Sequence, residues 1–114
     1  MSRTDEQRLE DILDAAAAID RAQDLGRTYS YDPEVAAVVL AAVEFHVFTI
    51  GEAVKGLSAG VKARRPEVLW SDIARMRDLI GHHYFRLDAE IVAATIGRPL
   101  EALRAACEDL TRPS

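Results

Sequence analysis

Apolar residues recur along most of this chain at intervals of three and four, the spacing of one face of a helix. The first such stretch predicts a helix that begins near Thr4 or Asp5 and stops at Gly26, and its apolar face holds Leu9, Ile12, Leu13, Ala16 and Ile19. A loop follows to Tyr31. Asp32 and Pro33 then form a start signal for a second helix that runs to about Leu57, because aspartate caps free N–H groups and proline is preset for the first turn.

The second half of the chain predicts shorter elements. Residues 58–69 look irregular, with at most a short helical turn before Pro66. Ser71 is expected to cap a third helix from Asp72 to about Tyr84, with an inward side formed by Ile73, Met76, Ile80 and His83. Asp88 is expected to cap a fourth helix through Ile96, and a last helix takes residues 99–110 after the interruption at Gly97. Without any alternating pattern, we expect an all-α protein: one domain over residues 1–114, folded as an up-and-down bundle of four to five helices.

The second helix is apolar around much of its circumference. Its apolar residues are Val35, Val38, Val39, Ala42, Val43, Phe45, Val47, Phe48 and Ile50. A helix that is apolar on more than one face packs against more than one neighbour. One neighbour is the rest of the chain, and we expect the other to be a second copy, in a homodimer.

Composition points to a reducing compartment. The lone Cys107 has no partner for a disulfide and no metal-ligand spacing, so we expect a cytoplasmic protein. The first six residues are polar and charged, which does not fit a signal peptide, and the apolar run from Val35 to Val43 is too short to cross a bilayer. We therefore expect no membrane partner.

Charge is unevenly distributed. Residues 55–86 hold seven basic and three acidic residues, so this segment carries +4 and the rest of the chain −9 of the net charge of −5. A local basic patch on an acidic body suits a polyanion bound at one place. The alternative is an ordinary solvated helix surface.

The candidate chemistry lies inside this basic segment, at Arg77-Asp78-Leu79-Ile80-Gly81-His82-His83-Tyr84. The guanidinium of arginine binds phosphate oxygens through paired hydrogen bonds, and histidine can take and give a proton near neutral pH. Asp78 and His82 are four residues apart, so they share a helix face and can hydrogen-bond. Arg77 and His82 are five apart and do not converge on a regular helix. Either Gly81 loosens the helix end, or the pair is assembled across a dimer, which we favour.

Structural roles compete with each of these assignments. The Asp78–His82 pair can be a weak surface contact, His83 and His46 can be packed histidines, and Tyr84 can be a core aromatic. The three histidines have no metal-ligand spacing, and no Gly-rich phosphate loop or nucleophile motif is present in the sequence. We therefore expect no metal and no cofactor. An enzyme built on this motif would be a metal-independent ribonuclease in which His82 assists attack by the 2′-hydroxyl and Arg77 stabilises the charged phosphate.

The arrangement Arg-x(4)-His-x-Tyr resembles the signature of HepT-like toxins in the HEPN ribonuclease superfamily. Three further segments resemble that family: residues 50–58 (Ile-Gly-Glu-Ala-Val-Lys-Gly-Leu-Ser), the run Trp70 to Arg77, and residues 8–13. The resemblance implies a dimeric HEPN bundle with both motifs at the dimer cleft. It implies the RNA-cleaving toxin of a type VII toxin–antitoxin system, whose antitoxin is an MNT-type nucleotidyltransferase.

Carried over by position, the resemblance makes Arg77 and His82 catalytic and Tyr84 the tyrosine that the antitoxin modifies with AMP. Asp78 stands where the family often has asparagine; it is a supporting polar partner whose charge puts the strength of RNA binding in doubt. Glu52 matches a family position without assigned chemistry and is a candidate partner for a buried basic group. Two other classes remain open: a catalytically inactive HEPN module that binds nucleotides or proteins, and a plain helical scaffold.

Overall fold

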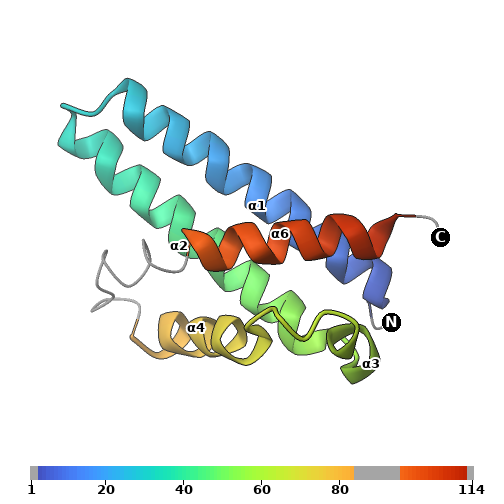
Figure 1. The fold of residues 1–114 in the computed structure, drawn as a ribbon. Helices are drawn as coiled ribbons and strands as arrows, with labels where there is room; N and C mark the ends of the chain where they lie inside the picture. Colours follow the sequence, from blue (N-terminus) through green and yellow to red (C-terminus); the bar gives the residue numbers. More distant parts are fainter. Residues whose placement is uncertain (1–2, 84–95, 113–114) are drawn as a thin grey trace.

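The computed structural model describes residues 3–83 and 96–112, and for residues 80–83 it describes the backbone alone. Every regular element in those ranges is a helix: α1 (Asp5–Thr28), α2 (Pro33–Gly56), α3 (Ala59–Ala63), α4 (Trp70–His83) and α6 (Arg98–Thr111) (Figure 1). The predicted all-α class is confirmed. The predicted fourth helix, from Asp88 to Ile96, lies outside the described residues except for its last position.

Side chains cap three helix starts, and one of these caps, at Asp32, was predicted. Thr4 caps α1 with a reciprocal pair, in which the Gln7 N–H donates to the Thr4 hydroxyl at 3.1 Å and the Thr4 N–H donates to the Gln7 side chain at 2.9 Å. The Asp32 carboxylate accepts the N–H of Glu34 at 2.9 Å and so caps α2, as predicted. Ser58 caps the short α3, which is the helical turn expected before Pro66.

Gly26 does not end the first helix, so that prediction is wrong. The Leu25 carbonyl accepts the N–H of Tyr29 at 3.1 Å, and α1 passes through the glycine to Thr28. Gly26 faces α2, where a Cβ atom placed on it would lie 3.5 Å from a methyl carbon of Val39. Packing against the neighbouring helix therefore overrides the local tendency of glycine to stop a helix.

Ser71 does not cap the third predicted helix, because α4 begins one residue before it, at Trp70. The Trp70 side chain is buried, and its indole N–H donates to the carbonyls of Lys62 at 3.1 Å and Arg65 at 3.0 Å. Those bonds anchor the start of the helix to α3 and to the loop that follows α3. The first turn is thus fixed by a tertiary contact that capping rules do not contain.

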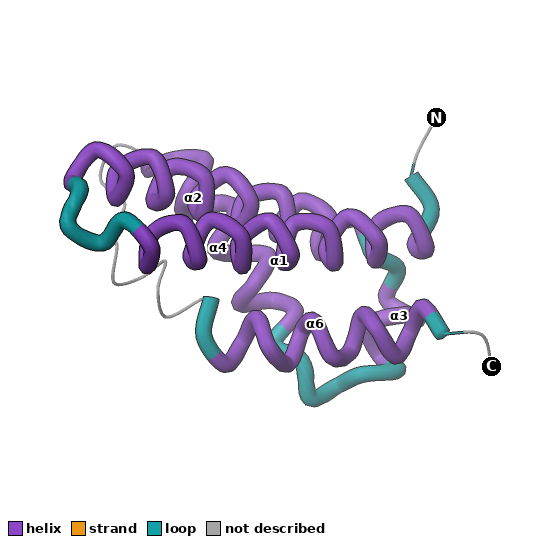
Figure 2. Tube along the Cα trace, turned by 90° about the horizontal axis from the view of Figure 1, so that it is seen from above, coloured by secondary structure: helices purple, strands orange, loops and turns teal. Residues whose placement is uncertain are grey.

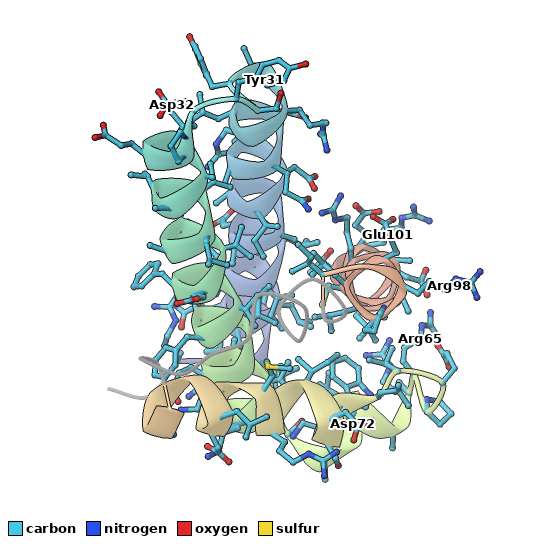
Figure 3. The ribbon with its side chains drawn as sticks, turned by 90° about the vertical axis from the view of Figure 1, so that its left-hand side faces the viewer. Tyr31, Asp32, Arg65, Asp72, Arg98 and Glu101 are labelled. Atoms are coloured by element: carbon cyan, nitrogen blue, oxygen red, sulfur yellow. The ribbon has the colours of Figure 1, made fainter. Side chains whose placement is uncertain are left out.

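Helices α1 and α2 form a long antiparallel hairpin, and they run alongside one another in both Figure 1 and Figure 2. Helix α4 packs on α2 and helix α6 on α1, and both cross the hairpin obliquely rather than following it (Figures 1 and 3). The up-and-down arrangement predicted for the whole bundle therefore describes the hairpin. The crossing of α4 over α2 is where the candidate chemistry lies.

The core occupies one half of this hairpin. Its fully buried side chains come from α1, α2, α4 and α6, with further contributions from the loop before α4: Leu9, Ile12, Ala15, Ala16, Ile19, Val43, Val47, Ile50, Ala53, Val54, Leu57, Val68, Trp70, Ile73, Leu100, Leu103, Ala106 and Cys107. No charged or polar residue is buried among the described residues, and the core consists of apolar residues and Cys107. The inward positions predicted for Ile73 and Met76 are confirmed, since Ile73 is buried and Met76 packs against this core.

The other half of the hairpin extends beyond α4 and α6 (Figure 1). No described residue between Ile19 and Val43 is fully buried. This half carries most of the large apolar side chains that the described chain exposes: Leu25, Tyr29, Tyr31 and Val38. Another exposed apolar side chain, Phe45, lies just beyond it on α2. The protruding half is therefore an apolar surface that stays exposed among the described residues.

Helix α2 is long and apolar enough, by length and composition, to cross a membrane, and 22% of its most apolar window is buried. The uninterrupted run from Val35 to Val43 thus understates its apolar length. One such helix is weak evidence for a membrane span, because a core helix of a soluble protein has the same properties. Its low burial is also what a helix shows when another protein chain covers it.

Candidate active site

Arg77 lies in the middle of α4, where this helix crosses α2. The two backbones approach closely because the facing position on α2 is Gly51, which is buried. A Cβ atom added to Gly51 would lie 3.2 Å from the Cα of Arg77 and closer still to its Cβ. The absence of a side chain at position 51 therefore sets the depth at which Arg77 is seated.

Three groups fix the guanidinium of Arg77. Its Nε donates to the Glu52 carboxylate and its NH1 donates to Asp78 Oδ1 at 3.0 Å. Its Cζ lies 5.0 Å from the centre of the Phe48 ring, a cation–π distance. The side chain is 28% exposed. The hydrogen bonds that Arg77 donates to Asp78 first and to Glu52 second raise its pKa above the usual value, so the group is permanently charged.

Asp78 has two cationic partners. Its Oδ1 accepts from Lys55 Nζ at 3.0 Å as well as from Arg77. The Lys55 hydrogen bond, followed by that of Arg77, lowers the pKa of Asp78 below its ordinary value. The carboxylate is thus ionised and already engaged with α2. The predicted contact between Asp78 and His82 involves a side chain outside the described residues and stays a prediction.

Two of the four predicted site residues are therefore placed with their side chains, and two are not. Arg77 and Asp78 are adjacent on α4 and joined by a hydrogen bond. His82 lies on the same helix, five residues further on, where only the backbone is described. Tyr84 lies outside the described residues. Convergence of Arg77 with His82, and the position of Tyr84, remain predictions.

The basic segment is largely offset by acidic partners. Lys55, Arg65, Arg75 and Arg77 each form an ion pair, with Asp78, Asp109, Asp72 and Glu52 respectively. Two of those acids, Glu52 and Asp109, come from outside the segment that was counted as basic. The cluster of Glu52, Lys55, Arg77 and Asp78 therefore sums to zero charge, and a patch of +4 does not describe this surface.

The other candidate groups fit structural roles. Burial first, and the charge of Arg21 second, lower the pKa of His46, whose ring meets Phe45 edge-on at 5.2 Å. Burial raises the pKa of the Cys107 thiol to about 12, so it is no nucleophile near neutral pH. Within residues 3–83 and 96–112, no group of three or more histidine, cysteine or acidic side chains is arranged to hold a metal ion.

Lys55 and Phe48 were not predicted as site residues, and Glu52 had only a suggested structural role. The structure gives Glu52 the basic partner that was suggested for it, and that partner is Arg77, which is half-buried rather than fully buried. Phe48, Glu52 and Lys55 are spaced by four and three residues on α2, which is a helix-face spacing. The sequence shows that these three residues share one face of a helix, but it does not show that α4 packs against that face.

With this geometry established, comparison with known proteins identifies the family. The family model described as ribonuclease HepT-like matches residues 8–110. The chain is 31% identical over 98% of its length, and over the full length of the relative, to "Probable ribonuclease HepT" of Thermococcus cleftensis. No solved structure matches the chain significantly.

Two further relatives match over shorter stretches. Both are named "Putative RNase": MJ0127 of Methanocaldococcus jannaschii, 46% identical over 38% of the chain and 36% of the relative, and TTE0752 of Caldanaerobacter subterraneus, 39% identical over 47% and 48%. The family match spans most of the chain and includes the α2–α4 crossing and the full motif. The chain belongs to the HepT-like ribonuclease family of the HEPN superfamily.

Proposed function

We propose that this protein is the toxin of a type VII toxin–antitoxin system and acts as a metal-independent endoribonuclease in the cytoplasm. The observation that carries the proposal is the seating of Arg77. Its guanidinium is held by Glu52, Asp78 and Phe48 at the crossing of two helices, on the helix that also carries His82. A fixed, permanently charged guanidinium on the same helix as a histidine suits the binding and cleavage of an RNA phosphodiester.

The reaction needs one base and one charge stabiliser. His82 takes the proton of the ribose 2′-hydroxyl, whose oxygen then attacks the adjacent phosphorus. The bond to the 5′-oxygen breaks, the leaving oxygen takes a proton from solvent water to become a 5′-hydroxyl, and a 2′,3′-cyclic phosphate remains on the other product. Arg77 stabilises the negative charge that develops on the non-bridging oxygens. Two of the five N–H donors of its guanidinium are committed to Glu52 and Asp78.

A homodimer would assemble this site from two copies. An exposed face of α2 carries Val38, Ala41 and Phe45 at helical spacing, and the same spacing continues to Phe48, Glu52 and Lys55. Val38 and Phe45 are each 64% exposed, which leaves them for a partner to cover. A second chain on this face would lie next to the Arg77 cluster, and two motifs would then line one cleft.

The proposed way in which the antitoxin neutralises this protein rests on the family resemblance. The partner is an MNT-type nucleotidyltransferase that transfers AMP from ATP to Tyr84, adding a negative phosphodiester and a bulky nucleoside near Arg77. Incubation with the nucleotidyltransferase of the neighbouring gene, ATP and Mg²⁺ should raise the mass in AMP-sized steps. Tyr84→Phe should abolish these steps, and steps that persist in Tyr84→Phe would place the modification elsewhere.

The central test is RNA cleavage by purified protein. Arg77→Ala and His82→Ala should each lower the rate by roughly 100-fold or more, the usual range for a charge stabiliser or a general base. Both variants should keep their helical circular dichroism, and EDTA should leave the wild-type rate unchanged. Glu10→Gln, an exposed change on α1, is the control. Full activity in folded His82→Ala would remove this mechanism, and an inactive wild type would favour a non-catalytic HEPN binding module.

A further inference from the structure

Asp78 poses an electrostatic problem for a site that binds RNA. Arg77 touches two carboxylates, those of Glu52 and Asp78, and these three groups alone sum to −1. A phosphodiester that approaches Arg77 would therefore meet a net negative trio. Each carboxylate also competes for the same N–H donors that a phosphate oxygen needs.

Lys55 changes both the net charge around Arg77 and the competition for its N–H donors. Its Nζ lies 3.0 Å from Asp78 Oδ1, which brings the four-residue cluster to zero charge. The same oxygen also accepts from Arg77 NH1 at 3.0 Å, so a single atom of Asp78 is shared between the two cations. A carboxylate drawn toward α2 in this way is not free to turn both of its oxygens onto the guanidinium.

The positions of these residues make the sharing possible. Glu52 and Lys55 are three residues apart on one face of α2, and Arg77 and Asp78 are neighbours on α4. The close approach at Gly51 brings the two pairs together, and the resulting chain alternates in charge: Glu52, Arg77, Asp78, Lys55. The side chains of Lys55 and Asp78 are 45% and 44% exposed, so RNA can reach the end of this chain.

We propose that Lys55 is a positioning residue of the nuclease site, which holds Asp78 on α2 and keeps it from competing with RNA phosphate for Arg77. This inference rests on the proposed ribonuclease function. It predicts a specific dependence: the importance of Lys55 comes from Asp78 and should vanish when residue 78 carries no charge. A lysine that binds RNA directly would show no such dependence.

A double-mutant cycle tests this dependence. The proteins are wild type, Lys55→Met, Asp78→Asn and the double variant, assayed for kcat and KM on a fluorescein-labelled single-stranded RNA at fixed salt. Lys55→Met alone should raise KM by about 10-fold, the size of one lost charge-assisted contact, with kcat changed less. In the Asp78→Asn background the same change should raise KM by less than about 2-fold. Lys55→Arg should keep near wild-type KM, since it preserves the charge next to Asp78.

Binding without turnover gives the same comparison independently. With His82→Ala in every protein, RNA affinity from fluorescence anisotropy should follow the KM pattern. Lys62→Met is the matched control, because it removes one lysine charge from α3, outside the cluster. Equal weakening by Lys55→Met with Asp78 and with Asn at position 78 would make Lys55 an RNA ligand and overturn the proposal. No weakening with Asp78 present would reduce the pair to a surface contact and overturn it as well.

A spectroscopic arm separates this proposal from the ribonuclease function. The NH1 proton resonance of Arg77, assigned by its loss in Arg77→Lys, reports the hydrogen bond that NH1 donates to Asp78 Oδ1. Lys55→Met should shift that resonance, and it should not shift it when residue 78 is asparagine. If the wild type does not cleave RNA, the ribonuclease function fails, and this resonance still decides the positioning role. An unchanged resonance in folded Lys55→Met would overturn the positioning role whatever the activity.

Discussion

The two ends of α2 carry different chemistry on one continuous face. Toward its N-terminus the face is apolar and exposed, with Val38 and Phe45 as its largest side chains. Toward its C-terminus the same face carries Glu52 and Lys55, and α4 supplies the opposite charges of Arg77 and Asp78. On this face, the apolar end has no partner among the described residues, whereas the charged end is covered by α4.

This difference separates two kinds of requirement. Apolar area can be covered by any surface of matching shape, so the exposed end leaves its partner to another chain. The charged end needs atoms placed within hydrogen-bond distance, so it is assembled by a helix crossing within the same chain. A single helix thus links the surface proposed for dimerisation to the residues proposed for RNA cleavage.

The largest expected effect is the difference in stability loss between a mutation in the buried half of the hairpin and one in its protruding half. Ile19→Ala removes a side chain with 0% exposure and should lower the free energy of unfolding by about 2–5 kcal/mol. Leu25→Ala, six residues further along α1, removes a side chain that is 46% exposed and should cost less than about 1 kcal/mol. Urea unfolding followed by circular dichroism measures both. Similar losses for the two variants would mean that the protruding half is packed as tightly as the core.

The helix crossing should be the next most sensitive feature. Gly51→Ala places a Cβ atom against Arg77 and should cost about 1–3 kcal/mol as α2 and α4 separate, and RNA cleavage should fall with it. Gly60→Ala is the matched control, since nothing lies within 4 Å of its added Cβ. That variant should be neutral or slightly stabilising. A Gly51→Ala protein with full stability and activity would show that Arg77 does not depend on the close approach.

The apolar end should affect assembly rather than folding. Val38→Ser combined with Phe45→Ser should halve the mass measured by light scattering at micromolar concentration, while the helical circular dichroism persists. Tyr31→Ser, at a side chain that is 100% exposed at the hairpin tip (Figure 3), is the control and should stay dimeric. RNA cleavage should fall with dimer dissociation if two motifs line one cleft. A wild-type protein that is a monomer at this concentration would remove the dimer model.

The smallest expected effect is the pH dependence contributed by Asp78. Its pKa is lowered in the folded protein, chiefly by Lys55 and then by Arg77. Its contribution to stability is therefore fully present above its ordinary pKa of 3.8 and is lost as pH falls through the lowered folded value. Asp78→Asn should remove this part of the acid dependence, so the stabilities of the two proteins should converge below pH 3.8. A difference that does not shrink there would mean that the ionised form is not what stabilises the fold.

Local rules anticipated the parts of the molecule that depend on nearby residues. The helix start near Thr4, the cap at Asp32, the short turn before Pro66 and the last helix were predicted from residues within or next to each element. The same rules failed at Gly26 and Ser71. At both places a contact from elsewhere in the chain, with Val39 or through the Trp70 indole, decided where the helix ended or began.

The candidate site divides in the same way. The all-helical class, the family, and the presence of Arg77, Asp78 and His82 in one motif were predictable from the amino-acid order, because helix periodicity and motif spacing are properties of the chain alone. By contrast, the contacts of Glu52 and Phe48 with Arg77, and of Lys55 with Asp78, are visible only in the folded arrangement of α2 and α4. These contacts span more than twenty residues of sequence. They depend on how deeply α4 settles against Gly51, a distance that is fixed by packing between helices rather than by any local preference.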